Sequence, residues 1–228
     1  MRGLVVIPAY QEFDSLPALF DRIGAAGVRE EILVVDDGST DGSAAWLLAR
    51  GIPHVRHPFN LGYTAALETG MLRARAMGCD YVVFLDADGQ HDPADLGKLA
   101  REIENGADVA IGSRYLDGYA GQSWSRRLGS VLFSAATSLS GVRVRDTTSG
   151  YKALSRRAIA AALEGAFGDY HAEFLLDMAG RGLRVREIPI QVRERKKGRS
   201  MYGLLSHFHY PAKTLLLILT RFLPGVRR

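Results

Sequence analysis

The chain has 228 residues, of which 47% are hydrophobic and 24% are charged, and its formal net charge is +4. This length is enough for a domain with a substantial buried core, and this composition excludes a disordered or fibrous protein. Cys79 is the single cysteine, which excludes an intrachain disulfide and fits a reducing compartment.

The first 110 residues alternate short β-branched apolar runs with helical patterns. We predict strands over Leu4–Ile7, Glu31–Val35, Tyr81–Leu85 and Asp108–Ile111, and helices over Leu16–Ala26, Ser43–Arg50, Ala65–Ala76 and Ala94–Asn105. Asp92 before Pro93 indicates a helix start, and Asp41 can cap the helix that follows it. This alternation predicts an α/β fold with a mainly parallel sheet and helices on both faces, where ligands bind at the carboxyl ends of the strands.

The residues after Gly112 follow a less regular pattern. In chain order we predict a loop over 115–122, a helix over 126–139, a turn-rich segment over 146–150, an extended piece over 151–154, helices over 156–163 and 171–181, a strand over 184–192 and a basic loop over 193–200. A final amphipathic helix follows. We therefore expect residues 1–200 to form one domain and residues 201–228 to form a C-terminal helix.

That final helix, Ser206–Leu223, places cations beside a Leu/Ile cluster, which is typical of a helix lying at a membrane surface. Packing on the protein's own core or in a dimer would explain the pattern as well. Thr220 and Arg221 interrupt its apolar run, so it is too short for a bilayer, which takes about 20 apolar residues. Met1–Pro8 lack the features of a signal peptide. We expect a cytoplasmic protein, peripheral on the cytoplasmic face of the membrane.

Charge is divided unevenly along the chain. Residues 1–110 hold nine Lys/Arg against 17 Asp/Glu, whereas residues 111–228 hold 20 against eight. The acidic half suits a metal ion, and the basic half suits an anionic partner. The segment 181–199 carries eight basic and two acidic residues, but no recognised nucleic-acid module accompanies it, so we predict no nucleic-acid partner.

The strongest chemical motif follows the predicted strand Tyr81–Leu85. Asp86 and Asp88 come directly after this apolar run, and Gln90 follows them. Two carboxylates at the ligand-binding edge of a sheet suit Mg²⁺ or Mn²⁺, which can in turn hold a diphosphate. An ordinary turn is the alternative, because Asp and Gly are common turn residues.

Two further strands end in polar or aromatic groups at the same predicted edge. Asp36 and Asp37 terminate the second strand and could accept hydrogen bonds from a nucleobase or a ribose, although a structural strand–turn–helix would also use them. Tyr10 could pack on a nucleobase, and Glu12 could bind its edge or the ribose. Three separate strands therefore deliver polar groups to one edge of the sheet.

Seven stretches of the chain resemble the family 2 inverting glycosyltransferases of GT-A fold, and most closely their polyprenyl-phosphate, dolichol-phosphate mannose synthase-like branch. They are VVIPAYQE, ILVVDDGSTDGS, HPFNLGYTAALETG, VVFLDADGQHDP, AIGSRYLDG, RDTTSGYKALSR and EIPIQVRERKKGRS. They span nearly the whole chain in a consistent order. The resemblance implies a GT-A fold, a GDP- or UDP-sugar donor, a divalent metal and a polyprenyl phosphate acceptor.

The resemblance also implies roles for individual residues. The nucleoside is contacted by Pro8, Ala9, Tyr10, Glu12 and Asp37, with Asp36 close by, and the donor site includes Asn60 and Gly62 of the third stretch. Asp86, Asp88 and Gln90 gather around the metal and the diphosphate. Arg114, Arg126 and Ser130 hold the acceptor phosphate, although a solvated helix face would also explain Arg126.

Three departures from the family pattern stand out. Relatives often carry Gly-x-Ser-Lys where this chain has Gly198 to Met201, so the basic role passes to Arg199 or is lost. Relatives often carry a hydrophobic residue in place of Gly89. Many relatives also carry transmembrane helices after the catalytic domain, and none fit here.

Three other functions remain open from the sequence. A glycosyltransferase of the same family could act on a soluble hydroxyl acceptor, and it would then need a general base. A sugar nucleotidyltransferase would carry a Gly-rich, Arg-containing loop where this chain has Pro8 to Glu12. A non-catalytic nucleotide-binding module would not need the two carboxylate motifs together.

Overall fold

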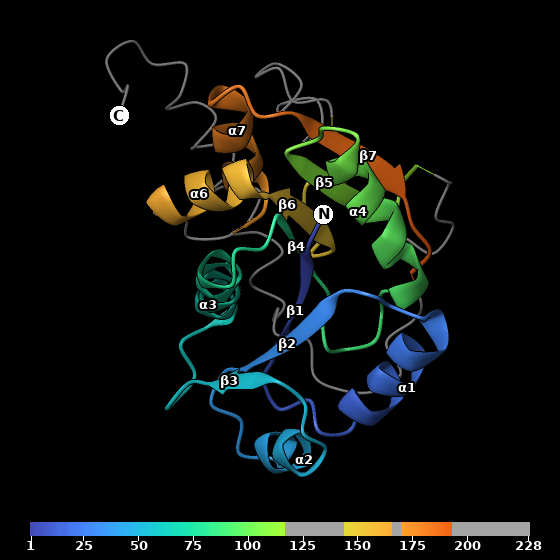
Figure 1. Cartoon of the computed structure of the whole chain (residues 1–228), viewed down its shortest axis with the longest axis vertical. Coiled ribbons are helices and arrows are strands. Elements are labelled where there is room, and N and C mark those ends of the chain that lie inside the picture. The colour runs from blue at the N-terminus through green and yellow to red at the C-terminus, as the bar shows by residue number, and fades with distance from the viewer. Residues whose placement is uncertain (117–143, 166–169, 193–228) are drawn as a thin grey trace, which may run out of the picture.

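The computed structural model describes residues 1–116, 144–165 and 170–192, and these residues form one seven-stranded sheet with helices packed on it (Figure 1). The elements in chain order are β1 (Gly3–Ala9), α1 (Leu16–Ala26), β2 (Glu31–Asp36), α2 (Ser43–Ala49), β3 (His54–Arg56), α3 (Tyr63–Ala76), β4 (Tyr81–Phe84), the 3₁₀ helix η1 (Pro93–Asp95), α4 (Leu96–Glu104), β5 (Val109–Ser113), β6 (Lys152–Ser155), α6 (Arg156–Glu164), α7 (Ala172–Gly180) and β7 (Val185–Pro189).

The strand order across the sheet is β3-β2-β1-β4-β6-β5-β7. All neighbouring pairs are parallel except those made by β6, which runs antiparallel to both β4 and β5. The predicted α/β fold with a mainly parallel mixed sheet is confirmed. Because β6 runs backwards, the residues that precede it meet the carboxyl ends of β4 and β5.

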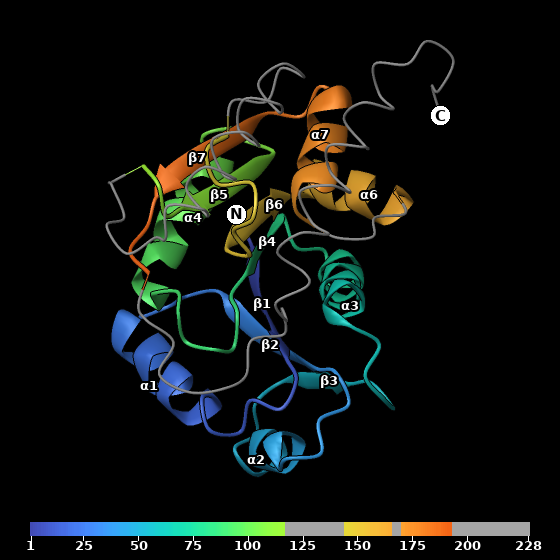
Figure 2. The same cartoon turned by 180° about the vertical axis from the view of Figure 1, so that it is seen from behind.

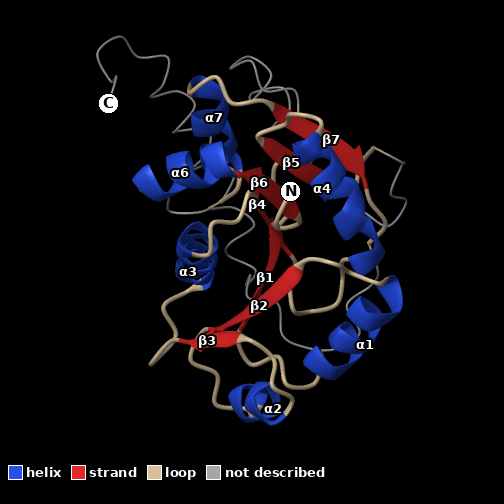
Figure 3. Ribbon diagram, in the orientation of Figure 1, coloured by secondary structure: helices blue, strands red, loops and turns tan. Residues whose placement is uncertain are grey.

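Side chains of each central strand alternate between two apolar cores, one on each face of the sheet. In β1, for example, Leu4 and Val6 belong to the core that includes residues of α3, α6 and α7, whereas Val5 and Ile7 belong to the core that includes residues of α1, α2 and α4. Figures 1 and 2 show α3 and α6 on one side of the sheet and α1 and α4 on the other, and Figure 3 shows the same layers by element type. Burial on both faces is why β1, β2 and β4 carry runs of apolar residues rich in Val, Ile and Leu.

Several predicted boundaries move. The strand β3 was not predicted, because its three residues form no apolar run. Helix α3 begins at Tyr63 and not at Ala65, and the strand predicted over 184–192 ends at Pro189. The predicted cap at Asp92 is confirmed, since its carboxylate accepts the N–H of Ala94 at 3.1 Å.

The prediction for Asp41 was one residue off. Gly42, with φ 97°, holds the N-cap position of α2. Asp41 still serves the helix start, because its Oδ1 accepts the N–H and the hydroxyl of Ser43 at 3.0 and 2.6 Å. A glycine fits the cap because the left-handed backbone there disfavours a side chain.

Some predictions lie outside the described residues. They are the helix over 126–139, the basic loop over 193–200 and the C-terminal helix in 201–228. Among the helices within 1–116, 144–165 and 170–192, none combines the length and the apolar character needed to cross a bilayer.

Candidate active site

The carboxyl ends of β1, β2 and β4 lie side by side at one edge of the sheet. Ala9 is in register with Asp36, and the N–H of Asp37 donates to the carbonyl of Ala9 at 2.8 Å. On the other side of β1, Val6 is in register with Phe84, two residues before Asp86. The three motifs that the sequence analysis expected at this edge are therefore neighbours.

Asp37 is buried, and its carboxylate is held by protein donors. Its Oδ1 accepts the N–H of Leu61 at 2.8 Å and lies 2.7 Å from Nδ1 of His57, while its Oδ2 accepts the N–H of Gly62 at 2.8 Å. The other ring nitrogen of His57 lies 2.9 Å from the Thr69 hydroxyl. Asp37 thus anchors the loop between β3 and α3, whatever else it binds.

Asp36 is also buried, with a side chain that is 0% exposed. Its Oδ1 accepts the N–H of Ser39, and Nε of Arg56 forms an ion pair with Oδ2 at 3.2 Å without hydrogen-bond geometry. Between the two carboxylates and the β3–α3 loop, Gly38 allows a very close approach. A Cβ at Gly38 would lie 2.5 Å from the carbonyl carbon of Phe59.

The loop after β1 offers an exposed aromatic ring and a carboxylate. Pro8 and Ala9 are buried in the strand, whereas Tyr10 is 39% exposed and Glu12 is partly exposed. The hydroxyl of Ser15 donates to the Glu12 carboxylate at 2.5 Å. Gln11, which lies between Tyr10 and Glu12, adopts φ 57°. Its carboxamide donates a hydrogen bond to the Thr40 hydroxyl and accepts one from the Thr40 N–H. This clasp stabilises a conformation that costs an ordinary residue free energy.

On the third loop of this group, Gly62 is tied to Asp37, as described above, and Asn60 is exposed. The backbone nitrogen of Asn60 lies 2.8 Å from the position of a Cβ on Gly38. The structure therefore brings together all eight residues expected at the donor, which are Pro8, Ala9, Tyr10, Glu12, Asp36, Asp37, Asn60 and Gly62.

Asp86 and Asp88 are partly exposed, in contrast to the buried pair on β2. The Tyr63 hydroxyl donates to Asp86 Oδ1 at 2.9 Å, and Asp88 Oδ1 accepts the N–H of Gln90 at 3.0 Å. Within the described ranges, no three His, Cys, Asp or Glu side chains are grouped to hold a metal ion on their own. Two carboxylates and a carboxamide are nevertheless hard oxygen donors, which fits a Mg²⁺ or Mn²⁺ ion that takes its other ligands from diphosphate and water.

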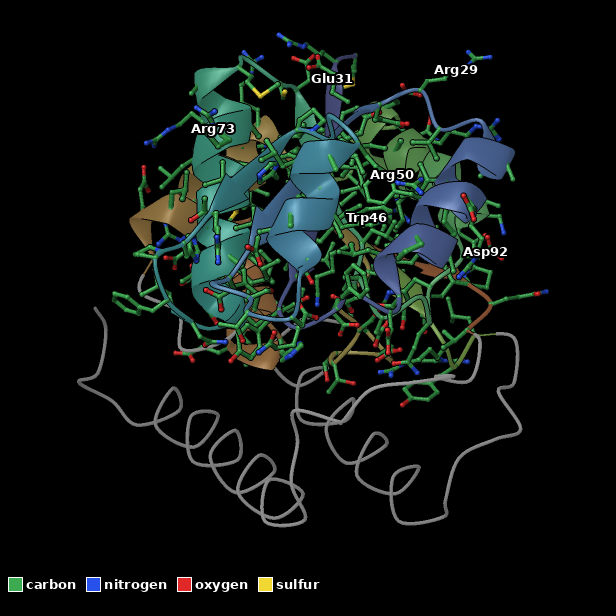
Figure 4. All side chains as sticks on the ribbon, turned by 90° about the horizontal axis from the view of Figure 1, so that it is seen from below. Arg29, Glu31, Trp46, Arg50, Arg73 and Asp92 are labelled. Carbon is green, nitrogen blue, oxygen red and sulfur yellow. The ribbon has the colours of Figure 1, made fainter. Side chains whose placement is uncertain are left out.

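The loop that carries Gln90 is clasped from both sides. Arg22 of α1 donates to the carbonyls of Gly89 at 2.7 Å and His91 at 2.8 Å, and it lies 3.6 Å from the carboxylate of Asp92. Figure 4 shows Asp92 alongside α1. On the other side, the Tyr151 hydroxyl donates to the carbonyl of Asp92 at 2.9 Å. These contacts fix the backbone on both sides of Gln90.

His91 is buried beside Asp86 and stacks on Tyr151, with ring centroids 4.7 Å apart. Its Nδ1 makes no hydrogen bond and lies 3.6 Å from Asp86 Oδ2. Burial lowers the pKa of His91, and this outweighs the opposite effect of Asp86. The imidazole is therefore neutral at physiological pH, so it adds no positive charge next to the carboxylates.

Arg114 does not stand free at the edge. Its Nε and Nη2 donate to Asp146 at 2.7 and 2.8 Å, and Nη2 also donates to the Thr148 hydroxyl at 2.7 Å. Burial alone would lower the pKa of Arg114 and raise that of Asp146, but their mutual hydrogen bonds and charges reverse both shifts. The two other residues expected at the acceptor phosphate, Arg126 and Ser130, lie outside the described residues.

Four residues of this site were missed from the sequence. Asp146 is the second residue of the stretch RDTTSG, and His57 and Tyr63 are the first and last residues of HPFNLGY, so their motifs were seen but not their roles. Arg22 lies inside an ordinary amphipathic helix, and nothing in its sequence context points to a loop near Gly89.

This geometry can be compared with known proteins. Residues 4–163 match the family described as glycosyl transferase family 2. The chain belongs to this family. The resemblance to family 2 glycosyltransferases stated from the sequence is confirmed.

Among curated relatives of this glycosyltransferase, polyprenol monophosphomannose synthase of Mycolicibacterium smegmatis is 37% identical over 216 residues, covering 86% of this chain and 79% of the relative. Undecaprenyl-phosphate mannosyltransferase of Micrococcus luteus is 34% identical over 216 residues, covering 88% and 87%. Dolichol-phosphate mannosyltransferase of Pyrococcus furiosus is 31% identical over 223 residues, covering 92% of this chain and 62% of the relative.

Solved structures support the GT-A-like fold. Glucosyl-3-phosphoglycerate synthase from Mycobacterium tuberculosis, in complex with UDP, superposes with a TM-score of 0.70 at 22% identity, covering 96% of this chain and 79% of the other. The same enzyme in complex with Mn²⁺, UDP and glucosyl-3-phosphoglycerate gives a TM-score of 0.67 at 22% identity, with the same coverage. At this identity the likeness concerns the fold alone.

Proposed function

We propose that this glycosyltransferase moves a sugar, with inversion, from a GDP- or UDP-sugar to a polyprenyl phosphate at the cytoplasmic face of a membrane. Three relatives at 31–37% identity are named as a polyprenol monophosphomannose synthase, an undecaprenyl-phosphate mannosyltransferase and a dolichol-phosphate mannosyltransferase, which supports this acceptor. The observation that carries the proposal is geometric: the segment before β6 pairs Asp146 with Arg114 at 2.7 Å and, four residues later, packs Gly150 against the Asp86 carboxylate, so the basic and acidic groups share one edge.

In this proposal, the loops after β1 and β2 and the loop before α3 hold the nucleoside. Tyr10 supplies an exposed ring for the base, and Glu12 supplies an acceptor at the rim. Asp86, Asp88 and Gln90 hold Mg²⁺ or Mn²⁺, which would neutralise the charge that develops on the leaving diphosphate. Complexes of a structural neighbour with Mn²⁺ and UDP support the use of a divalent ion.

The acceptor needs positioning and not deprotonation, because a phosphate monoester is already an anion at neutral pH. One phosphate oxygen attacks the anomeric carbon on the face opposite the diphosphate, and its new bond to carbon forms as the carbon–oxygen bond to the diphosphate breaks. Guanidinium groups suit this task, since they pair bidentately with phosphate. Asp146 balances the charge of Arg114 and fixes its orientation, so we assign much of the remaining attraction to Arg126 and Ser130.

Transfer assays test this function directly. Purified protein is incubated with GDP- and UDP-sugars, mannose donors first, with either Mn²⁺ or Mg²⁺ and with either a polyprenyl phosphate or a soluble saccharide. We expect a lipid-linked product, and we expect Arg126→Ala to reduce its formation while sparing donor hydrolysis. Efficient transfer to the saccharide with none to the lipid phosphate would replace this proposal by a soluble-acceptor enzyme.

A further inference from the structure

The carboxylate of Asp86 accepts a hydrogen bond from a residue that belongs to another element of the fold. Tyr63 is the first residue of α3, and its hydroxyl donates to Asp86 Oδ1 at 2.9 Å. Asp86 follows β4, 23 residues later. Because this hydrogen bond engages Oδ1, it favours one rotation of the Asp86 carboxylate and determines where Oδ2 points.

Oδ2 is constrained by close packing. A Cβ at Gly150 would lie 2.6 Å from Asp86 Oδ2 and 3.0 Å from the Tyr63 hydroxyl, so only glycine leaves the carboxylate room. Nδ1 of His91 lies 3.6 Å from the same oxygen. Asp86 is thus enclosed by the start of α3, by the segment before β6 and by the loop after β4.

Tyr63 is itself held in place. The residue before it, Gly62, donates its N–H to Asp37 Oδ2, and this fixes the start of α3 against the end of β2. The Tyr63 ring lines a small, mostly apolar cavity with Leu67, Phe84 and Phe174. A hydroxyl on a ring fixed at both its backbone and its side chain can direct the group that it contacts.

We propose that Tyr63 is a positioning residue for Asp86, and that its hydroxyl, together with the missing side chain of Gly150, sets the carboxylate in the orientation that takes the divalent cation. The inference rests on the proposed function, because it assumes that Asp86 is a metal ligand. Partners that orient metal-binding carboxylates commonly account for about 10–100-fold in metal affinity.

Tyr63→Phe removes one oxygen and leaves the ring. Mn²⁺ binding, followed by electron paramagnetic resonance with UDP or GDP present, should weaken by about 10–100-fold. In the transfer assay, the lost rate should return as the Mn²⁺ concentration is raised, and the thermal unfolding temperature without metal should stay near that of the wild type.

The matched control is Tyr81→Phe. Tyr81 begins the same strand β4, and its hydroxyl also donates to a carboxylate, that of Glu30, at 3.0 Å. Its Mn²⁺ affinity should equal that of the wild type.

Gly150→Ala provides a second, independent variant, because the added methyl group must displace the end of the Asp86 side chain. It should weaken Mn²⁺ binding as well. If Tyr63→Phe binds Mn²⁺ as tightly as the wild type, or if Tyr81→Phe loses as much Mn²⁺ affinity, the proposed role of Tyr63 is wrong. The metal site itself would still stand. A wild-type protein that binds no Mn²⁺ with either nucleotide would overturn the metal site and this inference together. The binding assay contains no acceptor, so a failure of the lipid proposal leaves its result intact.

Discussion

The two carboxylate pairs at the sheet edge, Asp36 with Asp37 and Asp86 with Asp88, differ in their burial and in their hydrogen bonds to the protein. Asp36 and Asp37 are buried and accept hydrogen bonds from the backbone and from side chains of neighbouring loops. Asp86 and Asp88 are partly exposed, so a ligand can reach them from solvent. The first pair therefore builds the site, and the second pair is suited to bind a cation.

The first prediction concerns Asp88. Asp88→Asn removes one charged ligand and should lower the transfer rate by about 10²-fold or more, because electrostatic stabilisation of the leaving group is lost. Rates measured across a Mn²⁺ titration check this. Asp14→Asn, which removes an exposed carboxylate without a ligand role, should leave the rates unchanged. Near wild-type activity of Asp88→Asn in the presence of a chelator would contradict the metal assignment.

The second prediction concerns Asp37. Asp37→Ala leaves the partly buried N–H groups of Leu61 and Gly62 without an acceptor, which costs about 1–3 kcal/mol in total. We expect a lower free energy of unfolding and weaker binding of UDP or GDP, since the donor loop loses its anchor. Denaturant unfolding and calorimetry measure the two effects. Reduced stability with unchanged affinity for both nucleotides would limit Asp37 to a structural role.

At the scale of elements, the Arg114–Asp146 pair joins the end of β5 to the segment before β6. The link continues beyond the pair, because the carboxylate of Glu187 on β7 accepts the N–H groups of Arg145 and Asp146. The segment that approaches β6 is therefore fixed by both of the strands that lie beyond it in the sheet. This segment also carries Gly150, which packs on Asp86.

The third prediction follows from this pair. Asp146→Asn should lower the free energy of unfolding at neutral pH by up to about 3 kcal/mol, since the partly buried guanidinium of Arg114 loses its charged partner. Arg114 holds the pKa of Asp146 below its ordinary value in the folded state. The stabilisation is therefore complete above the unfolded pKa of about 3.9 and is lost as the pH falls through the folded value.

Urea unfolding at pH 6 and pH 2.5 checks this, and the gap between wild type and Asp146→Asn should narrow at the lower pH. Asp177→Asn is the control, because its Arg181 pair lies on the surface and should contribute only about 0.5 kcal/mol. A gap that stays constant with pH would assign the loss to packing.

The sequence predicted the elements whose cause is local. Apolar runs ending in Asp gave β2 and β4 with their carboxylates, and Asp92 before Pro93 marked a helix start. The reversed direction of β6 is not written in any local pattern, because a buried strand reads the same in both directions. Contacts such as Tyr63 with Asp86 or Arg22 with Gly89 depend on how elements pack, and a single sequence carries no periodicity for them.

At the scale of the whole molecule, the excess of positive charge lies after residue 110, largely outside the described residues. We propose that residues 201–228 form a helix that binds the membrane surface next to the domain of residues 1–200. Each Lys or Arg near an anionic surface contributes about 1 kcal/mol, so a few are enough for reversible binding.

The fourth prediction tests this binding. The full chain should co-sediment with anionic vesicles at low salt and should be released in 1 M salt, where the Debye length is about 3 Å. A form that ends at Gly203 should bind much less. Equal binding of both forms would move the membrane contact to the domain itself, and binding that resists salt would indicate apolar insertion.

The link between the end of β5 and the segment before β6 also has a consequence for how acceptor specificity can differ between members of this family. Arg114 follows the last residue of β5, Asp146 precedes β6, and the two are joined by hydrogen bonds. Residues 117–143 are therefore inserted between two points that are already fixed together. We expect that such a segment can be replaced by one of different length without disturbing the residues proposed to bind the nucleotide, which lie before β5. Chimeras that swap it between relatives should change the acceptor and keep the donor.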